Sequence, residues 1–265
     1  MKKIILFLGI ACGLVSCLEV LELNHDNSDP VLVVEGLITD KPGPYTVRLS
    51  TTVSFNLSQR SNPVEDAIVT ISDDLGNQEI LNYVENGRYE TTSMQGMIGR
   101  TYYLDVAYGG VNYKSQSTLL PVSAIDTLYS TFEKATRFIE GGYYLSIGAK
   151  SANPNLVNYF RWKVYEADSL YNGVNDIMVA RDDYFEGEFV FQFGYPFEIG
   201  DTVKVEMYSL NKDAYDYYQG FVTILQSDGG LFSPPPVNAP SNISERVLGI
   251  FQACSVVSEE VIIAK

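Results

Sequence analysis

The sequence predicts an all-β protein made of two β-sandwich-like domains, of the immunoglobulin or prealbumin-like kind, with one helix in the second domain. Short segments in which apolar and polar residues alternate recur about every eight to twelve residues, which is typical of β-sandwiches rather than of βαβ units. Turn-forming residues separate these segments, as at 73–77 and 85–87. Only residues 211–225 carry apolar side chains at helical three- and four-residue steps.

The N-terminus is typical of a bacterial lipoprotein signal. Two lysines precede an apolar run at 4–11, and residues 14–17 (Leu-Val-Ser-Cys) fit a lipobox, in which a small residue precedes an acylated cysteine. We therefore expect residues 1–16 to be removed and Cys17 to carry acyl chains such as palmitate. Two or three chains anchor a protein firmly, since each buried methylene contributes about 0.8 kcal/mol and one chain is marginal. The alternative is a cleaved secretory signal followed by an incidental cysteine.

Residues 17–30 are mostly polar and predict a tether, and the first domain is expected to span residues 31–121. It begins with an apolar, β-branched run at 31–38, a turn containing Pro and Gly at 40–44, and an alternating segment at 45–50. Five more strands are predicted, with turn residues between them, at 67–72, 79–84, 88–92, 101–107 and 111–117.

The second domain is expected to span residues 122–265. Asn211 can cap the predicted helix at 211–225, Asp213 favours its first turn, and a glycine pair lies after its end. The predicted strands of this domain are 125–132, 143–150, 159–165, 177–180, 189–193, 202–210, 247–257 and 261–264.

A long proline-rich loop at 227–242 follows the helix. Loops of this length inside compact domains are usually functional or disordered. Consecutive prolines reduce the entropy that is lost on docking, so a stiff loop with an aromatic anchor suits a protein partner. The alternative is a structural crossover that packs on the second domain. The candidate partner-contact residues are Phe232, Pro234, Pro235, Pro236 and Asn238.

Charge and composition restrict the classes of function. The chain has 18 basic and 33 acidic residues, and removal of the signal leaves 16 basic residues and a net charge of −17. Nucleic acid is therefore not an expected partner, because phosphate backbones require clusters of Lys and Arg. The single histidine, His25, lies in the tether, which argues against most zinc sites and against a Ser/His/Asp triad. We expect no enzymatic activity, no catalytic residues and no cofactor.

The remaining cysteines leave no disulfide framework. Cys12 departs with the signal and Cys17 is expected to be acylated, so Cys254 has no partner within the chain. We expect Cys254 to face a core as a small apolar side chain.

Three sets of acidic residues could contribute oxygen ligands to calcium: Asp73 with Asp74, Asp182 with Asp183, and Asp213 with Asp216. None has the spacing of a known calcium loop, so no metal site is predicted. The first pair is more simply a hairpin turn whose side chains cap their own backbone.

Aromatic residues and short hydroxyl-containing motifs leave a glycan interpretation open. The chain has 19 Tyr, 13 Phe and one Trp, whose rings could stack on sugars or fill the two cores. The segments at 126–128, 168–170 and 201–203 resemble the O-glycan acceptor pattern of Bacteroidota envelope proteins, although three matches can arise by chance.

Several motifs in order resemble one family: 33–36 (VVEG), 42–50 (PGPYTVRLS), 200–203 (GDTV), 215–218 (YDYY), 232–235 (FSPP), 241–243 (SNI) and 248–251 (LGIF). With the lipobox, they resemble the Bacteroidota outer-membrane lipoprotein family carried as domain of unknown function DUF4249. One departure is Ser-Glu-Arg at 244–246, where relatives tend to have a glycine pair. The resemblance implies an outer-membrane lipoprotein, often encoded beside a TonB-dependent receptor, and supplies no catalytic residues.

We therefore expect a protein anchored in the outer membrane by its acyl chains, at the cell surface or on the periplasmic face. Its expected role is that of an accessory component of a TonB-dependent receptor in uptake or export. The alternative is a surface glycan-binding or adhesive β-sandwich module. A hydrolase is the third class, and it would have to rely on carboxylates alone.

Overall fold

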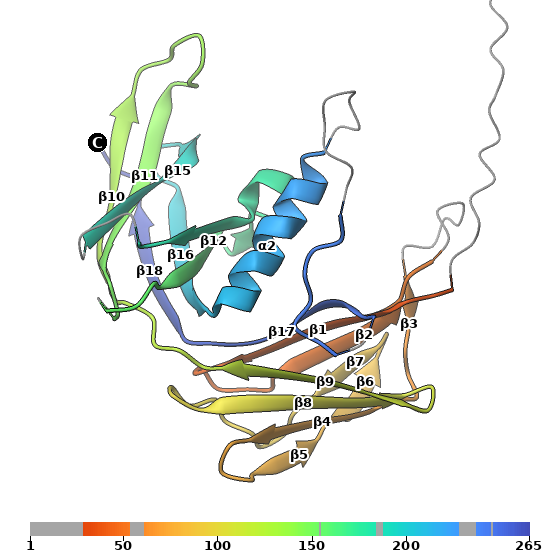
Figure 1. Cartoon of the computed structure of the whole chain (residues 1–265). Helices are drawn as coiled ribbons and strands as arrows, with labels where there is room; N and C mark the ends of the chain where they lie inside the picture. Colours follow the sequence, from red (N-terminus) through yellow and green to blue (C-terminus); the bar gives the residue numbers. More distant parts are fainter. Residues whose placement is uncertain (1–28, 54–60, 154, 184–187, 228–236, 245) are drawn as a thin grey trace, which may run out of the picture.

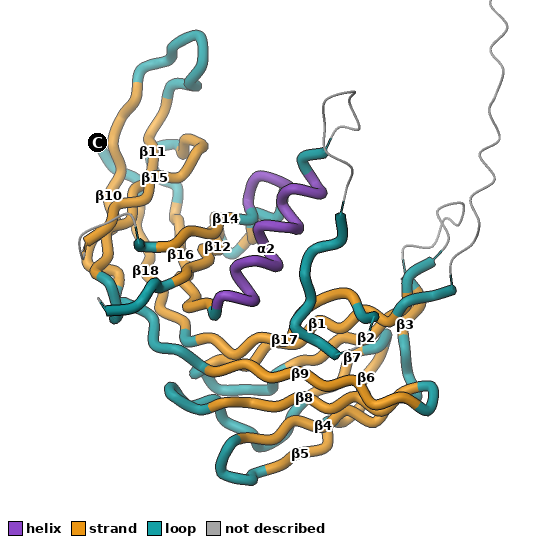
Figure 2. The backbone as a smooth tube through the Cα atoms, viewed as in Figure 1, coloured by secondary structure: helices purple, strands orange, loops and turns teal. Residues whose placement is uncertain are grey.

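The computed structural model describes residues 29–53, 61–153, 155–183, 188–227, 237–244 and 246–265. In these parts of the chain it has two β-sandwiches and one α-helix (Figures 1 and 2), which confirms the predicted fold class. The predicted signal peptide, Cys17 and all of the tether except its last two residues lie outside the described residues.

The first sandwich is built from a six-stranded and a four-stranded sheet. The six-stranded sheet has the order β17-β1-β2-β7-β6, with β3 beside β2, and the four-stranded sheet has the order β5-β4-β8-β9. The strands of the first sheet are β1 (Leu32–Thr39), β2 (Thr46–Thr51), β3 (Asn62–Pro63), β6 (Asn82–Glu85), β7 (Arg88–Glu90) and β17 (Leu248–Cys254). Those of the second are β4 (Ile68–Asp73), β5 (Gln78–Ile80), β8 (Thr101–Tyr108) and β9 (Val111–Thr118).

The core of this sandwich follows from the alternation of the sequence. Val34 and Ile38 in β1, Ile71 in β4 and Leu104 in β8 are buried in one apolar cluster between the sheets. Because successive strand residues point to opposite faces, the intervening side chains lie on the outer face of each sheet.

The second sandwich pairs a three-stranded sheet, in the order β10-β11-β15, with a five-stranded sheet, in the order β13-β12-β16-β18 with β14 beside β12. Trp162, Phe160 and Phe193 are fully buried between the two sheets. The strands are β10 (Ile125–Glu133), β11 (Gly142–Lys150), β12 (Tyr159–Glu166), β13 (Ser169–Leu170), β14 (Met178–Arg181), β15 (Glu188–Phe197), β16 (Thr202–Leu210) and β18 (Val256–Ile262), and the 3₁₀-helix η1 is Val174–Asp176.

Helix α2 (Lys212–Leu225) agrees with the prediction and contacts β12, β14, β16 and β17 (Figure 1). It buries Ala214 and Tyr218. Asn211 precedes the helix as predicted, but its side chain does not cap it. Instead its amide donates to Ser117 Oγ at 3.0 Å and to the Thr118 carbonyl at 3.2 Å. The Asn211 side chain therefore bonds the end of β9 and not the first turn of the helix.

Strand β17 connects the two sandwiches. The sequence predicts a second domain at 122–265, but β17 from this range pairs in parallel with β1 and completes a sheet of the first sandwich. The chain then continues through Ser255 into β18, which belongs to the second sandwich. Ser255 Oγ donates to the Leu120 carbonyl at 2.7 Å, so this junction is hydrogen-bonded to the segment that joins the sandwiches earlier in the chain. The two sandwiches are therefore not consecutive in the sequence.

Two features position β17, a close backbone approach on one edge and a side-chain amide on the other. Gly249 has a φ of +94°, and a Cβ atom there would lie 2.0 Å from the carbonyl oxygen of Val34 in β1. On the opposite edge, the Asn242 amide donates to the Phe251 carbonyl at 2.7 Å and accepts from the Phe251 N–H at 3.1 Å. Both residues belong to motifs on which the family resemblance depends.

Two predicted strands are divided differently in the structure. The predicted strand 79–84 is split into β5 and β6, which lie in different sheets. Its middle residue, Leu81, is buried and donates its N–H to the Val69 carbonyl at 2.9 Å, so the chain crosses between the sheets there. The predicted strand 247–257 is β17 followed by the start of β18.

Candidate functional site

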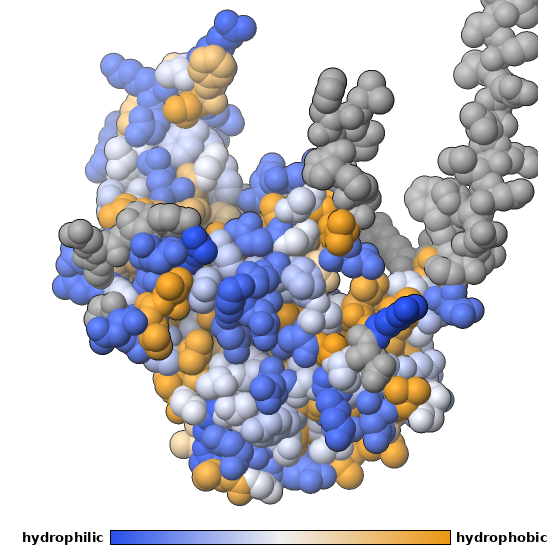
Figure 3. Space-filling view, viewed as in Figure 1, coloured by the Kyte–Doolittle hydropathy of each residue, from blue (hydrophilic) through white to orange (hydrophobic). Residues whose placement is uncertain are grey.

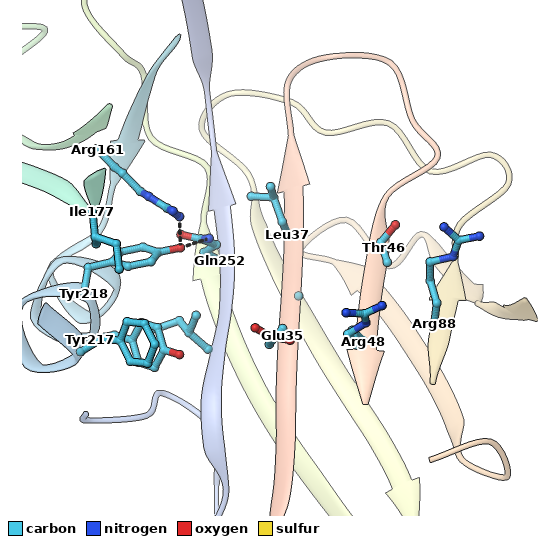
Figure 4. A pocket seen from close by; sticks show the side chains of 13 residues that line it. Glu35, Leu37, Thr46, Arg48, Arg88, Arg161, Ile177, Tyr217, Tyr218 and Gln252 are labelled. Atoms are coloured by element: carbon cyan, nitrogen blue, oxygen red, sulfur yellow. Dashed lines mark hydrogen bonds between the residues drawn. The ribbon is translucent and has the colours of Figure 1, made fainter. Parts of the chain in front are cut away.

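A cleft of about 460 Å³ lies between the two sandwiches (Figure 4). Its floor is the outer face of the six-stranded sheet, and its wall is formed by α2 and β12 of the other half of the molecule. We call it the inter-sandwich cleft. Its volume falls in the range of small-molecule sites. The residues used below are Glu35, Arg48, Arg88 and Gln252 of the floor and Arg161, Tyr217, Tyr218 and Phe221 of the wall.

A hydrogen-bonded group of three residues joins wall to floor. Arg161 Nη1 donates to the Tyr218 hydroxyl at 2.5 Å, and Gln252 Nε2 donates to the same oxygen at 2.8 Å. The guanidinium carbon of Arg161 also lies 4.1 Å from the centre of the Tyr218 ring, a cation–π contact. The Tyr218 oxygen thus accepts two hydrogen bonds, and its own proton is available to a further acceptor.

Burial controls the protonation of this group. It raises the pKa of Tyr218, and the charge of Arg161 and the hydrogen bond from Gln252 lower it only in part. The hydroxyl is therefore a neutral donor at physiological pH. Arg161 Nε is buried and, within the described part of the chain, has no hydrogen-bond partner. The wall thus places the positive charge of Arg161 beside the neutral hydroxyl of Tyr218.

The floor carries two further arginines on neighbouring strands. Arg48 in β2 lies opposite Arg88 in β7 and opposite Glu35 in β1 (Figure 4). Arg88 Nη2 lies 3.5 Å from Glu85 Oε1, and Arg88 Nε lies 3.4 Å from Glu90 Oε1. The guanidinium of Arg48, in contrast, has no carboxylate oxygen within 4 Å among the residues that the structure describes. Like charges directly opposite one another destabilise a sheet. Within the described residues Arg48 is thus the floor arginine that no carboxylate pairs, and its charge is available to an anion.

The charge of the cleft contrasts with that of the chain. Three arginines and one glutamate line it, whereas the whole chain has a net charge of −15. A recessed site of one sign concentrates the electric field and attracts counter-ions. Guanidinium groups bind carboxylates and phosphates through paired hydrogen bonds. Beside them, the rings of Tyr217 and Phe221 stack with centroids 6.1 Å apart and planes 8° from parallel.

The residues predicted from the sequence and those of the cleft overlap little. Cys17, Phe232 and Pro234, Pro235 and Pro236 lie outside the described residues, and Asn238 is exposed and does not line the cleft. Arg48, Arg88 and Arg161 are not among the predicted site residues. Their sequence signal is weak, because an arginine at an outward strand position normally indicates only a solvent-facing side chain.

The three acidic pairs serve local structure. The Asp73 carboxylate accepts from the N–H groups of Leu75 and Asn77 at 3.0 and 2.9 Å, which confirms the predicted hairpin turn. Asp182 accepts from the Asn158 N–H at 2.8 Å. Lys212 lies 2.5 Å from Asp216 within the helix.

Cys254 is a core residue, as the sequence predicts. Its side chain is fully buried in the apolar cluster that joins α2 to β16 and β17. Burial raises the pKa of its thiol to about 12, so the group stays neutral. Trp162 is likewise buried, so this ring fills a core and does not present a sugar-binding surface.

The fold defines an all-β protein whose two sandwiches are linked by the consecutive strands β17 and β18 and line a cationic cleft. The chain belongs to the family described as domain of unknown function DUF4249, whose model matches residues 19–260. This confirms the family to which the sequence motifs point.

Other comparisons add little. No curated protein matches the chain. Among solved structures, the crystal structure of chicken CNTN1 FN1-FN3 domains is similar, with 10% identity, coverage of 89% of this chain and 67% of that chain, and a TM-score of 0.28. So low a TM-score carries no argument about function. No helix in the described part of the chain has both the length and the apolarity to cross a bilayer.

Proposed function

We propose that this protein is a lipid-anchored, non-enzymatic binding protein of the cell envelope that holds an anionic ligand in the inter-sandwich cleft. The observation that carries the proposal is the convergence of Arg48, Arg88 and Arg161 from two sandwiches of an acidic chain. Guanidinium groups do not lose protons in proteins, so the cleft is equipped to bind rather than to exchange protons. Because burial raises the pKa of Tyr218, its hydroxyl also keeps its proton and serves binding.

The cellular role that we propose is that of an accessory component of a TonB-dependent outer-membrane receptor, in uptake or export. It rests on the lipobox that ends at Cys17 and on analogy with the family that the sequence motifs resemble. Anchoring at the membrane would keep the cleft beside the receptor. The cell surface is the proposed location, and the periplasmic face is the alternative.

A surface glycan-binding module is the second candidate. The stacked rings of Tyr217 and Phe221, with Phe221 partly exposed, offer an apolar platform of the kind on which sugars stack. An acidic oligosaccharide would use both this platform and the arginines. A neutral one would use the platform alone, which makes the two candidates separable.

Calorimetric titration of the chain from residue 18 onward, which keeps every described element, tests the proposal. The probes are inorganic phosphate, citrate, a uronic-acid oligosaccharide and its neutral counterpart. We expect an anionic probe to bind, with weaker affinity at higher salt. Arg48→Gln and Arg161→Gln should each weaken binding about tenfold to a hundredfold, since a hydrogen bond to a charged group contributes about 1.5–3 kcal/mol.

Lys150→Gln is the matched control, because Lys150 is an exposed cation of the second sandwich outside the cleft. Unchanged affinity in both cleft variants would refute the anion site, and binding of the neutral oligosaccharide alone would favour the glycan module. The accessory role has a separate test. A barrel receptor should co-purify with the tagged lipoprotein from detergent-solubilised membranes, and recovery without a receptor would contradict that role.

A further inference from the structure

The hairpin formed by β10 and β11 carries the most exposed large apolar side chain in the described part of the chain. Phe138, in the connection between the two strands, is 89% exposed. Ile139 beside it and Phe132 at the end of β10 are also exposed. The hairpin projects away from the rest of the molecule (Figure 1), and apolar atoms lie among hydrophilic ones near its end (Figure 3). Isolated exposed hydrophobic residues are common, but a group of exposed apolar side chains at a projecting apex marks an interaction site.

The tip has a defined structure. Thr136 Oγ1 accepts from the N–H groups of Phe138 and Ile139 at 3.2 and 3.1 Å, and the Thr136 N–H donates to the Ile139 carbonyl at 2.8 Å. The Tyr144 hydroxyl donates to the Glu140 carbonyl at 2.9 Å, which ties the start of β11 to the turn. The apolar side chains are thus held outward by a fixed backbone, so little further order is lost when they are buried by a partner.

Two cations accompany the apolar apex. Lys134 and Arg137 are exposed, and within the described residues neither lies within an ion-pair distance of a carboxylate. The guanidinium carbon of Arg137 lies 5.8 Å from the centre of the Phe138 ring. With Glu133 and Glu140 the tip is neutral, unlike the chain as a whole at −15. An anionic surface that repels the body of the protein would therefore not repel this end.

We propose that the tip of the β10–β11 hairpin inserts Phe138 and Ile139 into the interfacial region of a phospholipid bilayer, with Lys134 and Arg137 at the phosphate groups. Apolar side chains such as Phe insert at the boundary between headgroups and acyl chains, and long basic side chains extend from apolar surroundings to the phosphates. A convex apex needs no complementary pocket in such a fluid partner. This contact goes beyond the proposed function, since it requires neither the cleft nor the acyl chains.

Vesicle flotation of the non-acylated chain from residue 18 onward tests the contact directly. The vesicles are phosphatidylcholine, alone or with a minor fraction of phosphatidylglycerol. We expect the chain to float with them and Phe138→Ser to reduce its partition at least about tenfold, which is the effect of removing one fully buried aromatic side chain. Leu75→Ser should leave partition unchanged, because Leu75 is 69% exposed at another hairpin turn but has Asp74 beside it, and Arg100 at this turn is paired with Asp73.

Fluorescence gives a second readout that does not depend on loss of binding. The single tryptophan, Trp162, is buried, so Phe138→Trp adds one exposed reporter whose emission should shift to the blue on addition of vesicles. Failure of the unmodified chain to float, or equal partition of the Phe138→Ser and Leu75→Ser variants, would overturn the proposal. So would a Phe138→Ser variant that floats normally but no longer co-purifies with a protein partner, since the tip would then be a protein contact.

Discussion

Replacing Gly249 with alanine should separate β17 from β1 around this residue and destabilise the first sandwich. The backbone at Gly249 has a φ of +94°, which an L-residue adopts at about 1–2 kcal/mol. The new Cβ would also lie 2.0 Å from the Val34 carbonyl oxygen, so the two strands must separate. Loss of two backbone hydrogen bonds adds about 2 kcal/mol. We therefore expect unfolding to become easier by about 3–4 kcal/mol.

Gly76→Ala is the matched control. Gly76 has a similar φ of +86°, but nothing lies within 4 Å of its Cβ position. It should show only the backbone contribution of about 1–2 kcal/mol. Urea denaturation followed by circular dichroism measures both variants, and the buried Trp162 reports the second sandwich separately. Equal destabilisation by the two variants would refute the argument that close strand approach, rather than backbone conformation alone, requires glycine at 249.

Three other predictions concern separate parts of the molecule. Although burial raises the pKa of Glu79, hydrogen bonds from Thr92 and the next two backbone N–H groups outweigh it and lower the pKa to about 2. Its contribution of roughly 1–2 kcal/mol, discounted for solvent screening, should be complete above its unfolded pKa near 4.5 and be lost as the pH falls from there towards 2. Urea denaturation across this range should show a smaller pH dependence in Glu79→Gln, and an unchanged one would contradict the assignment. Asn242→Ala should destabilise the fold by about 2 kcal/mol or more, because the Phe251 N–H and carbonyl lose their partners; thermal unfolding measures this, and an unaltered Tm would count against it. Cys17→Ala should release the protein from the membrane fraction, and retention after a high-salt wash would show that the lipobox interpretation is wrong.

Local patterns predict the secondary structure because burial repeats along each element. The helix at 211–225 follows from the spacing of Tyr215, Tyr218 and Val222, and the structure places it at Lys212–Leu225. The strand at 45–50 follows from alternation in the same way. The prediction of one strand at 79–84 is wrong for a physical reason. Leu81 is buried, as a strand residue would be, but it lies where the chain passes from one sheet to the other.

The cleft could not be predicted because it depends on which sheet accepts each strand. The alternation around Arg48 indicates correctly that its side chain leaves the core of the first sandwich. It does not indicate that α2, more than 160 positions later in the sequence, lies across the same face. That placement follows from β17, whose own pattern fits either sandwich. The family motif at 215–218 contains Tyr217 and Tyr218, so part of the wall was marked without its use being evident.

The position of β17 late in the sequence also determines when the first sandwich can finish folding during synthesis. Residues 31–121 are synthesised first, but the sheet that contains β1 is incomplete until residues 248–254 have been synthesised. Until they arrive, β1 has an open edge that can pair with strands of other chains. A chain that stops short of residue 248 would therefore carry a damaged first sandwich, even though every residue of 31–121 is present. The chain must therefore extend through β17 and β18 before both sandwiches hold all of their described strands.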